Sequence, residues 1–197
     1  MTSNFLRTAL AIIFLISVNA QAESQPKLKS KCINTSCFSS RVSIGSYDLP
    51  IRAVSRFRYY FFKVYDGALY YPQDKNRLQL GVDPLKLELV YLRNIERDDL
   101  VQPSIDYFQK HSSSSYEGLK ERLDLLNTHY QSVKEGDRYS LEFVPGKGTT
   151  LSFNGEAKVT IPGDDFAREY LGIWLSNNTQ AKSFRKSLVG QLERGLE

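Results

Sequence analysis

Three short strands joined by tight turns, in the last third of the chain, limit the folds that this sequence can adopt. We expect these strands at residues 138–144, 149–153 and 157–161. Asn154-Gly155, between the last two, is a strong signal for a tight β-hairpin. Apolar and polar residues alternate strictly from Leu85 to Leu89, which predicts a further strand that residues 90–93 extend. Strands joined by short turns pair antiparallel, so an antiparallel sheet is expected.

Helical patterns lie before and after these three strands. We expect helices at 96–111, from Ser114 to Gly136, from Asp164 onward and after Thr179. In the longest of them, apolar residues spaced three and four apart form one face, and Gly136 ends the pattern. Strands, helices, strands and helices within 197 residues predict an α+β domain, in which helices pack against one face of a large antiparallel sheet.

Residues 56–71 are rich in Phe, Tyr and Arg and show no helical period, so they predict one long strand or two consecutive strands. Strand alternation places Tyr59, Phe61, Lys63 and Tyr65 on one face, and Arg56, Arg58, Tyr60, Phe62 and Val64 on the other. Because an unpaired guanidinium is costly to bury, these arginines need either internal acceptors or an anionic ligand. An aromatic core strand whose arginines reach solvent is the alternative.

The N-terminus predicts export. One cation, Arg7, precedes an unbroken apolar run at 9–16, and residues 20–22 match the small-x-small pattern that signal peptidases cut. The run is shorter than the ~20 apolar residues that cross a bilayer. We therefore interpret residues 1–22 as a signal peptide that is cleaved after Ala22, which predicts a periplasmic or secreted protein. An uncleaved anchor is the alternative.

Two cysteines follow in a polar stretch. Residues 23–39 are rich in Ser, Lys and Gln, and we expect them to form a flexible lead-in to a domain that spans 40–195. In an oxidising compartment, Cys32 and Cys37 are expected to form a small local disulfide. A redox-active pair is the alternative, although the spacing is not Cys-x-x-Cys.

Composition and motifs argue against several classes of protein. A net charge of +4 is too small and too scattered to predict nucleic-acid binding. With two cysteines and two histidines, His111 and His129, a metal centre is not expected. The chain has neither the Gly-x-Ser-x-Gly motif of serine hydrolases nor a phosphate-binding glycine loop. We therefore predict no metal, no cofactor and no catalytic residue, and leave the oligomeric state open.

Five short motifs follow one another along the chain. They are Phe62–Tyr70, Leu87–Ile95, 136–138, 145–149 and 165–175. Together they resemble the chalcone isomerase-like family, in particular its exported bacterial branch, over about Val42 to Gly190. The resemblance implies an open-faced β-sandwich, with a ligand cleft between the large antiparallel sheet and the helices packed on one face.

The resemblance also implies a binding site. In the family's plant enzymes an arginine and a hydroxyl stabilise a phenolate, and in related non-catalytic members an arginine and a tyrosine hold a fatty-acid carboxylate. By position, Tyr65 corresponds to the hydroxyl and Arg58 to the guanidinium. Further candidates in the same region are Arg56, Lys63 and Arg52. The implied function is non-catalytic binding of a small apolar, fatty-acid-like carboxylate, and the alternatives are an intramolecular lyase (an isomerase) and an envelope assembly protein.

Overall fold

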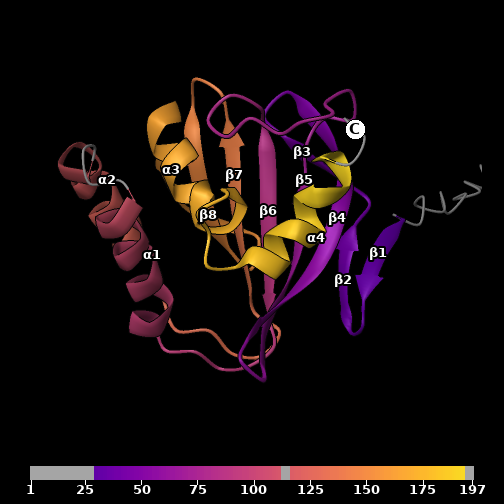
Figure 1. The fold of residues 1–197 in the computed structure, drawn as a ribbon, viewed down its shortest axis with the longest axis horizontal. Helices are drawn as coiled ribbons and strands as arrows, with labels where there is room; N and C mark the ends of the chain where they lie inside the picture. Colours follow the sequence, from indigo (N-terminus) through magenta and orange to yellow (C-terminus); the bar gives the residue numbers. More distant parts are fainter. Residues whose placement is uncertain (1–28, 112–115, 194–197) are drawn as a thin grey trace, which may run out of the picture.

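An antiparallel sheet of seven strands forms the centre of the fold (Figure 1). The computed structural model describes residues 29–111 and 116–193, and in these ranges the strands lie in the sheet in their sequence order. They are β3 (Arg41–Ile44), β4 (Tyr47–Tyr59), β5 (Phe62–Tyr70), β6 (Leu85–Tyr91), β7 (Arg138–Val144), β8 (Gly148–Phe153) and β9 (Glu156–Ile161). Each strand pairs antiparallel with the next.

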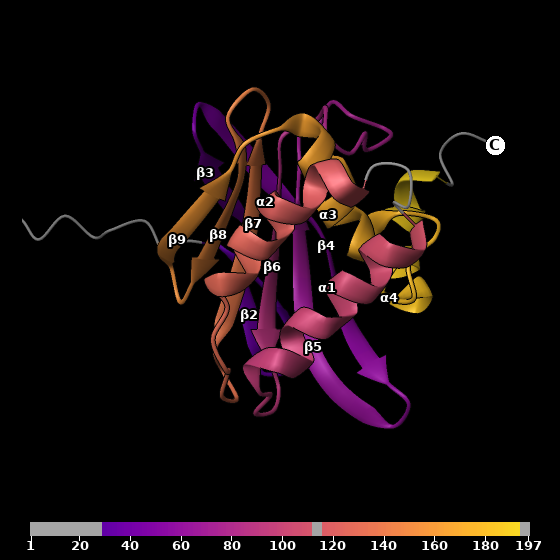
Figure 2. The ribbon, with the colours of Figure 1, turned by 90° about the vertical axis from the view of Figure 1, so that its left-hand side faces the viewer.

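The helices of the described ranges lie on one side of this curled sheet (Figures 1 and 2). They are α1 (Arg97–His111), α2 (Tyr116–Thr128), α3 (Asp164–Leu175) and α4 (Lys182–Glu193). The helix α4 lies over β4 and α3 lies over β8, whereas α1 packs against α3 and α2, and α2 reaches β9. The predicted α+β arrangement, with helices on one face of an antiparallel sheet, is confirmed.

The main hydrophobic core fills the space between the sheet and the helices. Leu69, Leu87 and Leu141, from three adjacent strands, cluster there with Phe166 of α3 and Phe184 of α4. All five side chains are almost completely buried. Removal of these large apolar side chains from water is the dominant favourable contribution to folding, and it fixes α3 and α4 against the sheet.

A second, smaller hydrophobic cluster lies on the opposite face of the sheet. It forms beneath a two-stranded hairpin, β1 (Ser30–Ile33) and β2 (Ser36–Ser39), which lies beside β4. Phe38 of this hairpin is buried together with Ala68 and Tyr70 of β5. Because successive side chains of a strand point to opposite faces, β5 is buried on both of them.

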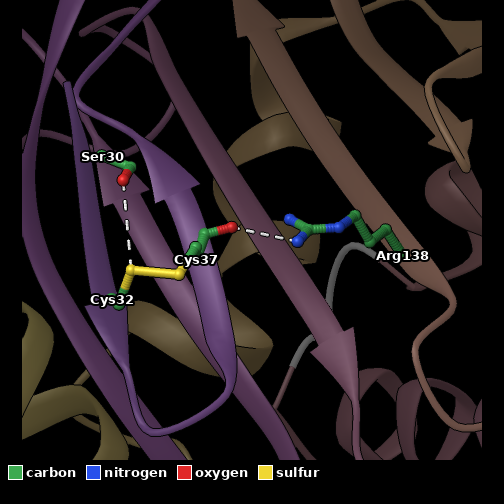
Figure 3. The surroundings of a disulfide bond; sticks show 4 residues. All are labelled: Ser30, Cys32, Cys37 and Arg138. Atoms are coloured by element: carbon green, nitrogen blue, oxygen red, sulfur yellow. Dashed lines mark hydrogen bonds between the residues drawn. A yellow bond between two sulfur atoms is a disulfide. The ribbon is translucent and has the colours of Figure 1, made fainter. Parts of the chain in front are cut away.

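Residues 30–39 differ from the expected flexible lead-in, because they form this hairpin. Cys32 and Cys37 are direct partners across it and are joined by a disulfide bond (Figure 3). Arg138 of β7 donates a hydrogen bond of 3.0 Å to the Cys37 carbonyl, which connects the hairpin to the sheet (Figure 3). The segment is mostly polar, so sequence reasoning overlooks Phe38. This side chain is buried and packs the hairpin against the sheet.

The long helix expected to reach Gly136 ends at Thr128 instead. The side chains of Thr128 and His129 both form hydrogen bonds with the Leu125 carbonyl, at 2.7 and 2.9 Å. Such local bonds compete with the continuation of helical hydrogen bonding. The following segment reaches the core without being helical, and its Val133 forms an isolated β-bridge.

Some expectations concern residues outside the described ranges. These are the signal peptide at 1–22, the part of the lead-in at 23–28, the helix start at Ser114 and the end of the domain at 195. Within the described ranges, no helix is both long enough and apolar enough to cross a membrane.

Gly67, in the middle of β5, allows α4 to approach the sheet closely. A Cβ atom at this position would overlap the ring of Phe184 and would lie 3.1 Å from a methyl carbon of Leu89. The absence of a side chain at Gly67 therefore determines how near the helix can lie.

Gly67→Ala is expected to lower the free energy of unfolding by about 1–3 kcal/mol, because the added methyl group forces Phe184 and α4 away from β5. Gly118→Ala is the matched control: its Cβ would meet open space on α2, and a gain of about 0.5–1 kcal/mol is expected. Urea denaturation followed by circular dichroism measures both. Unchanged stability of Gly67→Ala would contradict the close approach of α4.

Candidate functional site

Tyr65, whose hydroxyl is the sequence-predicted ligand contact, lies on the face of β5 that the helices cover. The residue is 8% exposed. Phe57 stacks on its ring at a centroid distance of 4.9 Å. The rings of Tyr91 and Phe184 meet it edge-on, at 5.8 and 5.3 Å. The Tyr65 hydroxyl is therefore surrounded by aromatic side chains and is largely excluded from water.

One hydrogen bond reaches this hydroxyl. Trp174 of α3 donates from Nε1 to the Tyr65 hydroxyl oxygen, at 3.1 Å. The Tyr65 hydroxyl also carries a proton of its own, and residues 29–111 and 116–193 present no acceptor for it. Buried polar groups in proteins normally satisfy their hydrogen-bonding capacity, so Tyr65 retains a donor that has no partner.

Six aromatic residues, one of them Tyr65, form a closed circle of contacts, which we call the tyrosine ring. Neighbouring members are joined either by ring contacts, with centroids 4.7–6.2 Å apart, or by hydrogen bonds of 2.8 and 3.1 Å. In order around the ring they are Tyr65, Tyr91, Tyr139, Tyr130, Tyr170 and Trp174. Three strands, the segment after α2 and the helix α3 contribute to it.

Burial keeps the tyrosines of the ring in their neutral, hydrogen-bond-donating form. Desolvation raises the pKa of Tyr65, Tyr91, Tyr130 and Tyr170 above the ordinary value of 10.0. Tyr130 and Tyr170 share a single hydroxyl–hydroxyl bond of 2.8 Å, which uses only one of their two protons. Among the described residues, the Tyr65 proton and one of the Tyr130 and Tyr170 protons therefore have no acceptor, an arrangement that suits a negatively charged oxygen atom.

Arg58 does not face Tyr65. Phe57 stacks on Tyr65 on the helix side, so the next residue of β4 points to the opposite face. Val64 is an extra residue in β5 between the pairs Phe57–Tyr65 and Arg58–Lys63, and this bulge places Lys63 on the face of Arg58. The structure thus corrects the expected alternation at Lys63 and does not bring Arg58 and Tyr65 together; contact of either cation with a ligand stays a prediction.

Two other predicted arginines have partners inside the protein. Arg56 donates from Nε and Nη2 to both carboxylate oxygens of the fully buried Asp66, at 2.6 and 2.8 Å. Arg52 donates to the Pro72 carbonyl at 2.6 Å, and its guanidinium carbon lies 4.5 Å from the centre of the Tyr71 ring. Arg56 and Arg52 therefore have acceptors inside the protein, and contact of either guanidinium with a ligand stays a prediction.

Sequence reasoning misses five members of the tyrosine ring. Tyr91, Tyr170 and Trp174 lie within the motifs that carry the family resemblance. Their presence in those motifs could have identified them as candidates. Tyr130 and Tyr139 belong to no motif, and only the packing of the segment after α2 against β7 brings them to the ring.

Two cavities in the described part of the chain lie away from the tyrosine ring. One, of about 390 Å³, lies between α1 and α2 and is lined by polar side chains that include Arg97, Asp124 and Asn127. The other, of about 170 Å³, lies between the ends of α3 and α4 and the loop that carries Arg77 and Leu80. The described residues contain no group of three His, Cys, Asp or Glu side chains placed to hold a metal ion.

Arg56→Ala is expected to lower the free energy of unfolding by about 3–5 kcal/mol, because it leaves the buried Asp66 carboxylate without a cation. Arg41→Ala is the matched control: it removes an exposed ion pair with Asp48, and little change is expected. Urea denaturation measures both variants. A loss for Arg56→Ala no larger than that of the control would contradict this structural role and would favour Arg56 as a ligand-binding residue.

Comparison with known proteins agrees with this architecture. The family model described as chalcone isomerase-like matches residues 33–190. A search of curated proteins finds no match. Among solved structures, the fold is similar to that of a fatty-acid binding protein of Arabidopsis thaliana, with 13% sequence identity and a TM-score of 0.62; the alignment covers 83% of this chain and 97% of that chain. At this identity the likeness concerns the fold alone, and it confirms the expected open-faced β-sandwich.

Proposed function

The chain belongs to the chalcone isomerase-like family, and we propose that it is an exported, non-catalytic member that binds a small apolar carboxylate at the tyrosine ring. The ligand class is an acid with a mainly hydrocarbon body, of the fatty-acid type. The family and the similarity of the fold to that of a fatty-acid binding protein support this class.

The observation that carries the proposal is the Tyr65 hydroxyl proton, which has no acceptor in the described part of the chain. A carboxylate oxygen at this point accepts a hydrogen bond from Tyr65 and a second from the indole N–H of Trp174. Neutral donors suffice to hold an anion, because a carboxylate that accepts two or three N–H bonds remains ionised well below its ordinary pKa. The aromatic rings around the hydroxyl contact the apolar part of the ligand.

Trp174 is the side chain that moves to admit the ligand. It is only partly buried, and it is held by the single hydrogen bond to Tyr65 and by an edge-on ring contact with Tyr170 at 5.7 Å. When a carboxylate replaces Tyr65 as the acceptor of the indole N–H, α4, which packs closely on the sheet at Gly67, moves outward, and the hydrocarbon body of the ligand contacts Phe57 and Phe184 in the space that opens. Burial of that body supplies most of the affinity.

Export completes the proposal. The signal-peptide pattern at 1–22 supports it, and so does the disulfide between Cys32 and Cys37, since disulfides persist in oxidising compartments. N-terminal sequencing of the protein recovered from cells is expected to begin at Glu23, in a periplasmic or secreted fraction. Recovery of the chain with Met1 or its immediate neighbours intact, in the cytoplasmic fraction, would contradict export.

Titration with medium- and long-chain fatty acids is expected to change the fluorescence of Trp174, the single tryptophan of the chain. Tyr65→Phe is expected to weaken binding about 10- to 100-fold, because a hydrogen bond to a charged oxygen is lost. Tyr70→Phe is the matched control, since it removes a hydroxyl without a partner from the other face of the same strand, and unchanged affinity is expected. Because burial raises the pKa of Tyr65, affinity is expected to hold up to about pH 10.

Three results would contradict this site or this function. Equal affinity in Tyr65→Phe and the unchanged protein would remove Tyr65 from the site. Loss of binding in Arg77→Ala, with Tyr65→Phe unaffected, would move the ligand to the cavity of about 170 Å³ at the ends of α3 and α4. Conversion of a chalcone faster than in buffer would replace the binding function by that of an intramolecular lyase.

A further inference from the structure

The turn between β4 and β5 exposes four consecutive aromatic side chains. Tyr59, Tyr60, Phe61 and Phe62, which we call the aromatic tip, are 61%, 79%, 93% and 60% exposed. Because β6 pairs with β5 only from Tyr65 onward, this end of the hairpin extends beyond the sheet, as Figure 2 shows at lower right. Single exposed apolar residues are common, whereas a contiguous exposed group indicates an interaction surface.

Backbone strain at the tip argues that its aromatic side chains have a use. Tyr60 has φ = 52°, in the left-handed region that glycine, asparagine and aspartate adopt most readily. The two-residue turn between β8 and β9 uses Asn154 and Gly155, the residues that such turns favour. A bulky ring at the equivalent strained position of the β4–β5 turn costs stability, so it is retained for another reason.

Cations without acidic neighbours surround the aromatic tip. Arg58 and Lys63 are paired across the hairpin beside it, and the guanidinium carbon of Arg93 lies 5.1 Å from the centre of the Phe62 ring. Residues 56–65 include no Asp or Glu. Among the described residues, none of these three cations has an ion-pair partner, so their positive charge is available to an external anion.

We propose that the aromatic tip docks the protein onto the surface of a bilayer that contains anionic lipids. Phe61, the most exposed of the four, enters the boundary of the hydrocarbon region, while the tyrosines stay at headgroup depth, where their hydroxyls remain hydrated. The flanking cations contact lipid phosphate groups. This is attachment to a membrane surface, separate from the tyrosine ring and independent of what that ring binds.

The shape of the tip favours a bilayer over a protein partner. The tip is the convex end of a two-stranded hairpin, and a protein would need a deep aromatic socket to cover all four rings. The headgroup region deforms around such a projection without a preformed socket. The two-residue turn also leaves few backbone groups without hydrogen-bond partners, which limits the cost of entering the interface.

Vesicle sedimentation tests the proposal. The protein, in the form that accumulates in cells, is mixed with vesicles of phosphatidylcholine alone or of phosphatidylcholine and phosphatidylglycerol in equal parts. We expect stronger binding to the mixed vesicles, and weaker binding as salt is added. The double variant Tyr60→Asn, Phe61→Gly is expected to bind at least about tenfold more weakly, because two apolar rings are lost. Its melting temperature is expected not to fall, because Asn-Gly suits a tight turn.

Charge and location are tested by single variants. Lys63→Gln is expected to reduce binding to the mixed vesicles by about fivefold and to leave binding to phosphatidylcholine unchanged. Tyr47→Ser and Lys147→Gln are matched controls, because both residues are exposed at the opposite end of the sheet, Tyr47 at the start of β4 and Lys147 in the turn between β7 and β8. Both controls are expected to bind as the unchanged protein does.

Equal vesicle binding by the double variant and the unchanged protein would overturn the proposal. So would a protein that ignores both kinds of vesicle but self-associates in ultracentrifugation through the tip, since that result assigns the tip to a second copy of the chain. If the double variant fails to fold, Lys63→Gln decides: a fivefold loss on mixed vesicles alone supports docking, and no loss contradicts it.

Discussion

The burial of β5 on both faces is the constraint on which the rest of the structure depends. Tyr65 and Leu69 point to the helices, whereas Ala68 and Tyr70 point to the β1–β2 hairpin. The two faces of β5 carry different side chains. The face toward the helices carries aromatic rings and hydroxyl donors. The other face carries the Asp66 carboxylate paired with Arg56, because a buried charge requires a counter-charge. Gly67, between these residues, sets the distance at which α4 can close over the sheet.

The β4–β5 hairpin has two parts with different roles. The bulge at Val64 marks the boundary. Residues 58–63, at the turn, belong to an exposed projection with aromatic rings and cations that have no ion-pair partner among the described residues. From Tyr65 onward, β5 belongs to the packed interior. This boundary explains why Arg58 and Tyr65, seven positions apart, serve different environments. We assign the guanidinium to a lipid surface and the hydroxyl to a small internal ligand, both as proposals.

Much of the fold could be predicted from sequence, and the exceptions share a cause. The strands between 138 and 161 follow from alternation and turn residues, which act over a few neighbouring positions. The helix end at Thr128 was not predicted, because the side chains of Thr128 and His129 donate hydrogen bonds to the Leu125 carbonyl, while the apolar spacing of the sequence continues beyond this point. The hairpin at 30–39 was not predicted, because its packing depends on one buried ring, Phe38, which contacts strands that are distant in the sequence.

The sequence by itself determined the α+β class, the antiparallel sheet, the membership of a family and the importance of Tyr65 as a candidate, because periodicity, turn chemistry and short motifs are local properties. Only the tertiary structure decided which partner Tyr65 has. Trp174 is 109 residues away along the chain, and it meets the Tyr65 hydroxyl because α3 packs across the sheet. The other tyrosines of the ring are likewise brought together by the packing of α3 and of the segment after α2 against the sheet. Contacts between distant residues depend on how whole layers fit together, and no local pattern specifies that fit.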